Sequence, residues 1–137
     1  MPSFIQEVEH KTSENSGLKL TIACNYSGRY DILQACQKVA KKVEQGKLRP
    51  EDIVESDIQQ ELGTSWMKEI ENPDLLIRTS GELRISNFLL WQLAYSELYF
   101  MTEYWPEVNE ISYADALLSY QKRNRRFGAR PLINPDQ

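Results

Sequence analysis

Short apolar runs alternate with helix-like stretches along this chain, and this alternation limits the possible folds more than any other feature. Leu18–Cys24 alternates apolar and polar residues and predicts a β-strand. Asp74–Thr79, bounded by turn residues, predicts a buried strand, and Glu97–Met101 predicts another. Strands that alternate with helices are typical of an α/β layer with a parallel sheet. Because such sheets are covered on both faces, three strands indicate only a partial parallel sheet with flanking helices.

Amphipathic spacing and capping residues predict the helices. A helix is expected from Asp31 to the stop at Gly46, and a nearly all-apolar, buried helix over Asn87–Tyr95. The other expected helices are a short one over Phe4–Glu9, one that begins at Pro50, one capped by Ser56-x-x-Gln59, and a last one capped by Ser112-x-x-Asp115 and closed by Gly128.

Composition excludes several classes of protein. His10 is the single histidine, which removes any multi-histidine metal site. Cys24 and Cys36 lie in apolar contexts and are expected to be buried free thiols, neither a disulfide nor a zinc site. The net charge of −4 argues against nucleic-acid binding by the whole chain.

The segment Arg78–Asn87 is the strongest candidate site. Arg78 ends a predicted strand, Gly81 allows a sharp bend, and Arg84 and Ser86 precede a predicted helix. Two guanidinium groups, a hydroxyl and free N–H groups at a helix start would converge on an anion with several oxygens, such as phosphate or diphosphate. In the alternative, Arg78 pairs with a neighbouring acid such as Glu82, while Ser86 or Asn87 only caps the helix.

Other features have both a structural and a functional interpretation. Glu97 enters a predicted strand and needs either an arginine or a hard cation as its partner. The basic run Lys122–Arg130 either complements a helix C-terminus, contacts phosphates as an arm, or forms a nucleic-acid patch. An aromatic cluster is interpreted as core or interface; its members are Trp91, Tyr95, Tyr99 and Phe100.

Three motifs in order resemble the cis-prenyltransferases, the undecaprenyl/dehydrodolichyl diphosphate synthase family. Asp74–Phe100 resembles the signature region of that family. Asn25–Ile32 is similar to a preceding motif that usually reads Asn-Tyr-Gly-Gly-Arg, and Arg125–Gly128 is similar to its closing Arg-x-Gly motif. The resemblance covers nearly all of residues 3–130, so we expect residues 1–130 to be the C-terminal part of such a domain and 131–137 a flexible tail.

The resemblance implies a function: cis condensation of isopentenyl diphosphate onto an allylic prenyl diphosphate, with Mg²⁺ as cofactor. It also implies a homodimer or a heteromer with a full-length relative, no nucleic-acid partner, and peripheral membrane association through the lipid product. The residue roles carried over are isopentenyl diphosphate binding by Arg78, Arg84, Ile85 and Ser86, magnesium binding by Glu97, and a cross-dimer diphosphate contact by Arg126 and Gly128.

The sequence departs from the family in one respect, because the N-terminal motif with an Asp-Gly-Asn string does not occur. That motif supplies the family's principal magnesium ligand and holds the allylic diphosphate. We therefore expect this chain to be a fragment that does not extend prenyl chains by itself. The alternative is a non-catalytic subunit that pairs with a full-length cis-prenyltransferase.

Overall fold

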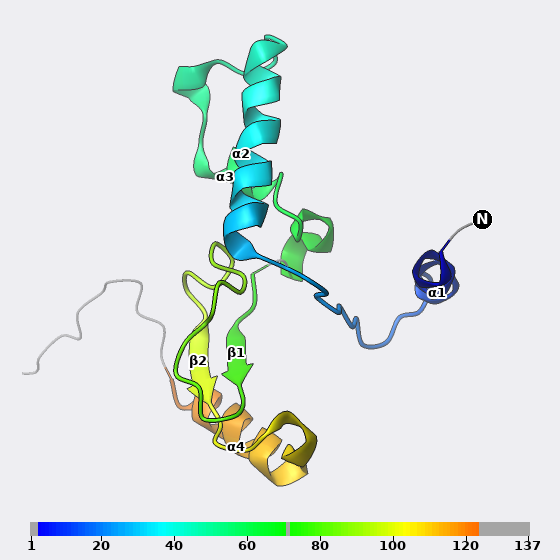
Figure 1. Cartoon of the computed structure of the whole chain (residues 1–137), viewed down its shortest axis with the longest axis vertical. Helices are drawn as coiled ribbons and strands as arrows, with labels where there is room; N and C mark the ends of the chain where they lie inside the picture. Colours follow the sequence, from blue (N-terminus) through cyan, green and yellow to red (C-terminus); the bar gives the residue numbers. More distant parts are fainter. Residues whose placement is uncertain (1–2, 71, 124–137) are drawn as a thin grey trace, which may run out of the picture.

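The computed structural model describes residues 3–70 and 72–123. Figure 1 shows an elongated molecule, with a helical part at one end, the last helix at the other and a small sheet between them, while an N-terminal arm, residues 3–25, stands apart. The elements are helices α1 (Phe4–Thr12), α2 (Gly28–Glu44), α3 (Glu55–Gln59) and α4 (Glu110–Gln121), 3₁₀ turns η1 (Pro50–Asp52), η2 (Ser65–Ile70) and η3 (Trp105–Glu107), and strands β1 (Leu75–Arg78) and β2 (Glu97–Phe100).

The sheet confirms the predicted α/β class. β1 and β2 pair in parallel, with Leu75 opposite Glu97 and Arg78 opposite Phe100, and α4 packs against β2. Parallel strands are expected here because about twenty residues separate the two runs, which is too long for a hairpin. The buried apolar side chains of the described chain are Ala35, Val39, Leu62, Leu93, Met101 and Ala116.

The prediction of a strand over Leu18–Cys24 is wrong. Residues 18–23 have no regular secondary structure, and Leu18, Leu20 and Ile22 are exposed by 95%, 77% and 75%. The alternating pattern is present, but a strand also needs a hydrogen-bonded neighbour, and none of the described segments pairs with this one. The cysteine prediction is half wrong: Cys24 and Cys36 are free thiols, but both are exposed.

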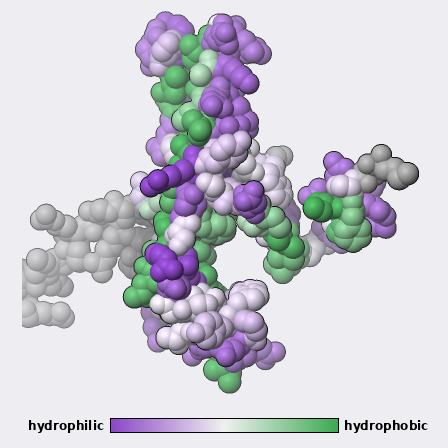
Figure 2. All heavy atoms as spheres, in the orientation of Figure 1, coloured by the Kyte–Doolittle hydropathy of each residue, from purple (hydrophilic) through white to green (hydrophobic). Residues whose placement is uncertain are grey.

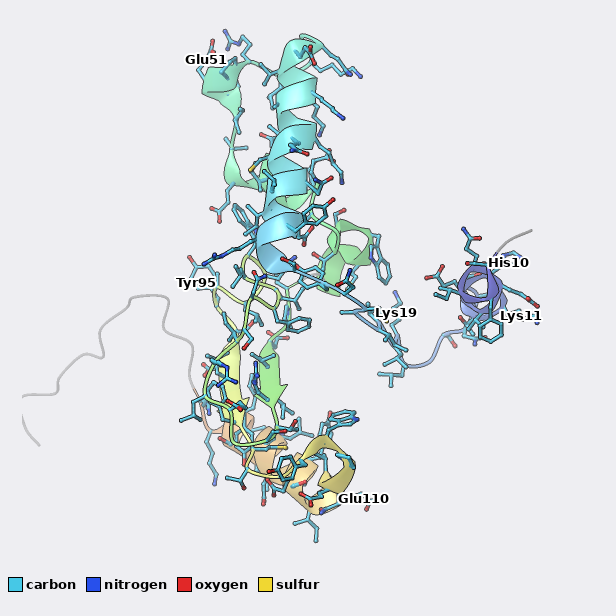
Figure 3. All side chains as sticks on the ribbon, in the orientation of Figure 1. His10, Lys11, Lys19, Glu51, Tyr95 and Glu110 are labelled. Carbon is cyan, nitrogen blue, oxygen red and sulfur yellow. The ribbon has the colours of Figure 1, made fainter. Side chains whose placement is uncertain are left out.

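The predicted helix over Asn87–Tyr95 is also wrong, because this segment is a succession of turns. Asn87 and Leu89 have φ of 64° and 43°, a left-handed conformation that cannot continue a right-handed helix. Trp91 is half-buried and Tyr95 is exposed, as its outward position in Figure 3 shows. The aromatic side chains of this segment therefore do not form a compact core in the described chain.

Helix positions are predicted better than their caps. α2 ends close to Gly46, whose φ is 67°, but it begins at Gly28, three residues before Asp31. α3 is stabilised by Asp57, which accepts from the Val54 N–H at 2.9 Å, and not by Ser56. α4 is capped by Asn109, whose Oδ1 accepts from the Ile111 and Ser112 N–H groups at 3.0 and 3.2 Å. The caps proposed at Ser56 and Ser112 are wrong because each helix starts earlier than its apolar pattern.

A buried polar network joins the helical part to the turn segment 87–95. The Asp31 carboxylate is 8% exposed, and it accepts hydrogen bonds from Tyr26 Oη at 2.7 Å, the Gly63 N–H at 2.6 Å and Gln92 Nε2 at 3.2 Å. Gln92 Nε2 also donates to Thr64 Oγ1 at 2.9 Å. A buried carboxylate is stable only when its oxygens are hydrogen-bonded in this way.

No helix of the described residues has the length and apolarity needed to cross a membrane.

Replacement of Gly28 by alanine should destabilise the chain. A Cβ atom at Gly28 would lie 2.9 Å from both the Asn87 carbonyl oxygen and Leu90 Cγ, so backbone would have to move. We expect a loss of about 1–3 kcal/mol in the free energy of unfolding, measured by urea titration of the circular dichroism signal. Gly17→Ala is the control, because nothing lies within 4 Å of its added Cβ, and its stability should match wild type. Equal stability of the two variants would contradict the contact.

Alkaline pH should destabilise the buried network through Tyr26. Burial, and then the hydrogen bond to the Asp31 carboxylate, raise the pKa of Tyr26 above its usual value of about 10. The folded state therefore keeps the proton that the unfolded chain loses, so stability contributed by Tyr26 is full below about pH 10 and declines as pH rises further. Urea unfolding from pH 8 to 11 should show a smaller alkaline loss for Tyr26→Phe than for wild type. Tyr30→Phe, at an exposed tyrosine, should keep the wild-type loss.

Candidate functional site

Arg78 closes β1 at the carboxyl end of the strand, where ligands bind in open α/β sheets. Its carbonyl oxygen accepts from the Met101 N–H at 2.7 Å, which ties its backbone to the residue after β2. Its side chain is half-buried, and no acid or hydrogen-bond acceptor of the described residues contacts it. A half-buried arginine with no acid partner among the described residues is electrostatically suited to an anionic ligand.

The loop after Arg78 is held against the end of β2. The Ser80 N–H donates to the Glu103 carbonyl at 2.7 Å, and the Gly81 N–H donates to the Met101 carbonyl at 2.8 Å. Both residues are left-handed, with φ of 70° and 66°, which produces the sharp bend that the glycine predicted. The loop is therefore fixed at its start by the sheet edge.

The other predicted diphosphate contacts lie further along the same loop. Arg84 is exposed and forms an ion pair with Glu82, so the acid partner weighed for Arg78 belongs instead to Arg84. Ile85 is half-buried, and its carbonyl accepts from the Phe88 N–H at 3.0 Å. Ser86 is exposed, with φ of 46°. No hydrogen bond joins Arg78, Arg84 and Ser86 to one another in the described chain.

Asn87 fixes the far end of the loop to the first turn of α2. Its carbonyl accepts from the Gly28 N–H at 2.8 Å, its Oδ1 accepts from the Arg29 N–H at 2.9 Å, and its Nδ2 donates to Ser27 Oγ at 2.8 Å. Asparagine suits this place because it tolerates a left-handed backbone while its amide both donates and accepts. The predicted helix start at Ser86 is thus wrong, and the helix N-terminus that does lie nearby is already occupied by Asn87.

Glu97, the expected magnesium residue, has an arginine as its partner. Arg123 Nη1 donates to Glu97 Oε2 at 2.9 Å and to the Leu98 carbonyl at 2.8 Å. No cluster of three or more acidic, histidine or cysteine side chains in residues 3–70 and 72–123 could hold a metal ion. The described residues therefore do not fit a magnesium site on their own. Arg126 and Gly128, expected to reach a partner's diphosphate, lie outside the described residues.

The anchoring role of Asn87, Asp31 and Gln92 was missed by sequence reasoning. Gln92 is 3% exposed, and its Oε1 has no hydrogen-bond partner among the described residues. One signal was available, because Gln92 is a lone amide within the apolar run Phe88–Ala94. A buried polar side chain in such a run needs hydrogen-bond partners. Asp31 and Thr64 are these partners, because both accept hydrogen bonds from Gln92 Nε2.

Comparison with curated proteins finds relatives that are named as prenyl-transferring enzymes. Dehydrodolichyl diphosphate synthase 2 of Arabidopsis thaliana is 53% identical over 126 residues, which cover 92% of this chain and 40% of that protein. The isoprenyl transferase of Shouchella clausii is 48% identical over 132 residues, covering 93% of this chain and 50% of that protein. This chain thus spans about half the length of the curated relatives it matches.

Solved structures and family models agree with these relatives. Lavandulyl diphosphate synthase from Lavandula x intermedia, solved with dimethylallyl diphosphate, matches with a TM-score of 0.86 and 43% identity. The match covers 94% of this chain and 56% of the lavender chain. The Prenyltransf family model, that of undecaprenyl diphosphate synthases, matches residues 1–128. A match of this extent shows that the chain belongs to the undecaprenyl diphosphate synthase family of cis-prenyltransferases.

Proposed function

We propose that this chain provides the isopentenyl diphosphate half-site of a cis-prenyltransferase. The observation that carries the proposal is Arg78, a half-buried arginine at the carboxyl end of β1 with no acid partner in the described residues. The relatives of this chain are named as synthases of prenyl diphosphates. A diphosphate group carries negative charge and several oxygens that can accept hydrogen bonds from an arginine. Its planar fork can donate two hydrogen bonds to such a group.

Arg84, Ile85 and Ser86 complete the proposed half-site. The loop is fixed at one end by the sheet and at the other by Asn87, so Ser86 has a defined backbone although its side chain is exposed. Arg84 reaches a diphosphate only by exchanging its Glu82 partner for the ligand. Because exposed ion pairs are weak, about 0–1 kcal/mol, a doubly charged ligand can displace Glu82.

The reaction we propose joins isopentenyl diphosphate to an allylic prenyl diphosphate in cis geometry. The allylic C–O bond breaks and the allylic diphosphate leaves, the new C–C bond forms, and the isopentenyl unit loses a proton while keeping its own diphosphate. Positive groups beside the allylic diphosphate stabilise its departing charge, which is electrostatic catalysis, whereas the half-site proposed here binds and orients isopentenyl diphosphate. Glu97 is at most one ligand of a magnesium site, so further ligands have to come from outside the described residues. The allylic substrate, the metal and the dimer contact through Arg126 and Gly128 all belong to this proposal.

Isopentenyl diphosphate binding tests the half-site directly. Isothermal titration calorimetry without metal should give binding to wild type and at least tenfold weaker binding to Arg78→Ala, since a hydrogen bond to a charged group contributes about 1.5–3 kcal/mol. Arg84→Ala should weaken binding less. Glu82→Gln should strengthen binding severalfold, because it frees Arg84 and removes a negative charge.

Arg49→Ala is the matched control for these titrations. Arg49 is exposed, pairs with Glu51 and Asp52, and precedes η1 in the helical part of the molecule, away from the sheet (Figure 1). This variant should bind isopentenyl diphosphate like wild type. If Arg78→Ala also binds like wild type, the proposed half-site is wrong.

A further inference from the structure

Arg29, in the first turn of α2, is a cation at a place where helices favour acids. The N-terminus of a helix carries about half a positive charge, so a cation there lowers the stability of the helix. Asp31, the acid of this turn, is buried and already accepts three hydrogen bonds from other groups. Arg29 is exposed, and no acid among the described residues pairs with its guanidinium group. Local stability therefore does not explain an arginine at this position.

Arg29 borders a hollow beside the proposed half-site. The hollow has a volume of about 180 Å³, and it is lined by Arg29, Asn87 and Leu90. Asn87 follows Ser86 directly in the chain, and its Oδ1 accepts from the Arg29 N–H at 2.9 Å. This hydrogen bond fixes the backbone of Arg29 next to the end of the loop that carries Ser86. In Figure 2, strongly hydrophilic side chains (dark purple) lie both beside the N-terminal end of α2 and over the sheet below it.

The positive end of α2 favours an anion in this hollow, although its N–H groups are already used. The Gly28 N–H donates to the Asn87 carbonyl at 2.8 Å, and the Arg29 N–H donates to the Asn87 side chain. An anion in the hollow would thus be bound by the side chain of Arg29. The helix dipole adds to the positive potential there, in the same sense as the guanidinium group.

The half-site has little positive charge to spare without Arg29. Arg84 is paired with Glu82, so Arg78 provides most of the net charge that this loop offers to a ligand. A phosphate monoester carries about 1.5–2 negative charges at neutral pH, and a diphosphate carries no fewer. A further arginine at the end of the loop would balance this charge while Arg84 keeps its acid partner.

We propose that Arg29 is a further diphosphate-binding residue, and that the hollow between Arg29, Asn87 and Leu90 receives a phosphate group of the ligand. The planar guanidinium of Arg29 donates hydrogen bonds to the phosphate oxygens. The unfavourable place of this arginine in the helix is then a loss of stability that serves binding. The inference rests on the proposed isopentenyl diphosphate half-site and extends it by one residue.

Replacement of Arg29 should change affinity and stability in different directions. In isothermal titration calorimetry without metal, Arg29→Ala should bind isopentenyl diphosphate about three- to tenfold more weakly than wild type, and Arg29→Glu at least tenfold more weakly. Arg29→Glu places an acid in the first turn of α2, so its free energy of unfolding in urea should be no lower than that of wild type. If both variants lose stability together with affinity, Arg29 is a structural residue and the inference is wrong.

Inorganic pyrophosphate separates a phosphate contact from a contact with the prenyl tail. Because the proposed contact is with phosphate oxygens, Arg29→Ala should weaken pyrophosphate binding by the same factor as isopentenyl diphosphate binding. A loss confined to isopentenyl diphosphate would contradict the phosphate contact. Lys41→Ala is the matched control, because Lys41 is an exposed cation in the last turn of the same helix, away from the sheet (Figure 1). This variant should bind both ligands like wild type.

The same titrations distinguish this inference from the half-site on which it rests. Wild-type affinity of Arg29→Ala, together with weak binding by Arg78→Ala, would overturn the role of Arg29 and leave the half-site standing. The reverse result, in which only Arg29→Ala binds weakly, would overturn the half-site at Arg78 and leave the anion contact of Arg29. A wild-type chain that binds neither ligand would contradict both proposals.

Discussion

The attachment of the turn segment 87–92 to the first turn of α2 is the interaction on which the rest of the structure depends. Asn87 makes three hydrogen bonds to residues 27–29, and Gln92 reaches the buried Asp31 carboxylate. These bonds connect the helical part to the sheet part across about sixty residues of sequence. The Asn87–Ser27 hydrogen bond is partly buried and the Gln92–Asp31 hydrogen bond is buried, where an unmade hydrogen bond would be costly.

The same attachment determines what the candidate site can be. One end of the loop after Arg78 is held by the sheet, and the other end is held by Asn87. Arg84 and Ser86 lie between these two points, and both are exposed and accessible to a ligand. The proposed half-site is thus a loop between two fixed points, which limits the entropy lost when it binds a diphosphate. Arg78 lies at the end fixed by the sheet, so its side chain is expected to contribute more to ligand affinity than that of exposed Arg84.

Local patterns predicted the elements that depend on local interactions. The two strands at Leu75–Arg78 and Glu97–Phe100 follow from apolar runs between turn residues, and the long helix α2 follows from its amphipathic spacing. Patterns failed where a partner distant in sequence decides the conformation. Leu18–Cys24 has the alternation of a strand but no paired neighbour in the described chain, and Asn87–Tyr95 has the apolarity of a helix but is turned into left-handed positions while it bonds to α2.

By itself the sequence determined the α/β class, the parallel strands, the family and the position of Arg78 at a strand end, because hydrophobic periodicity and motif spacing are properties of neighbouring residues. Only the tertiary structure decided that Asn87 hydrogen-bonds the first turn of α2, that Arg84 pairs with Glu82, that Arg123 pairs with Glu97, and that the N-terminal arm is exposed. Each of these depends on which groups meet in space. These contacts are set by the whole fold, because each buried polar group needs a hydrogen-bond partner and each apolar face is more stable when buried.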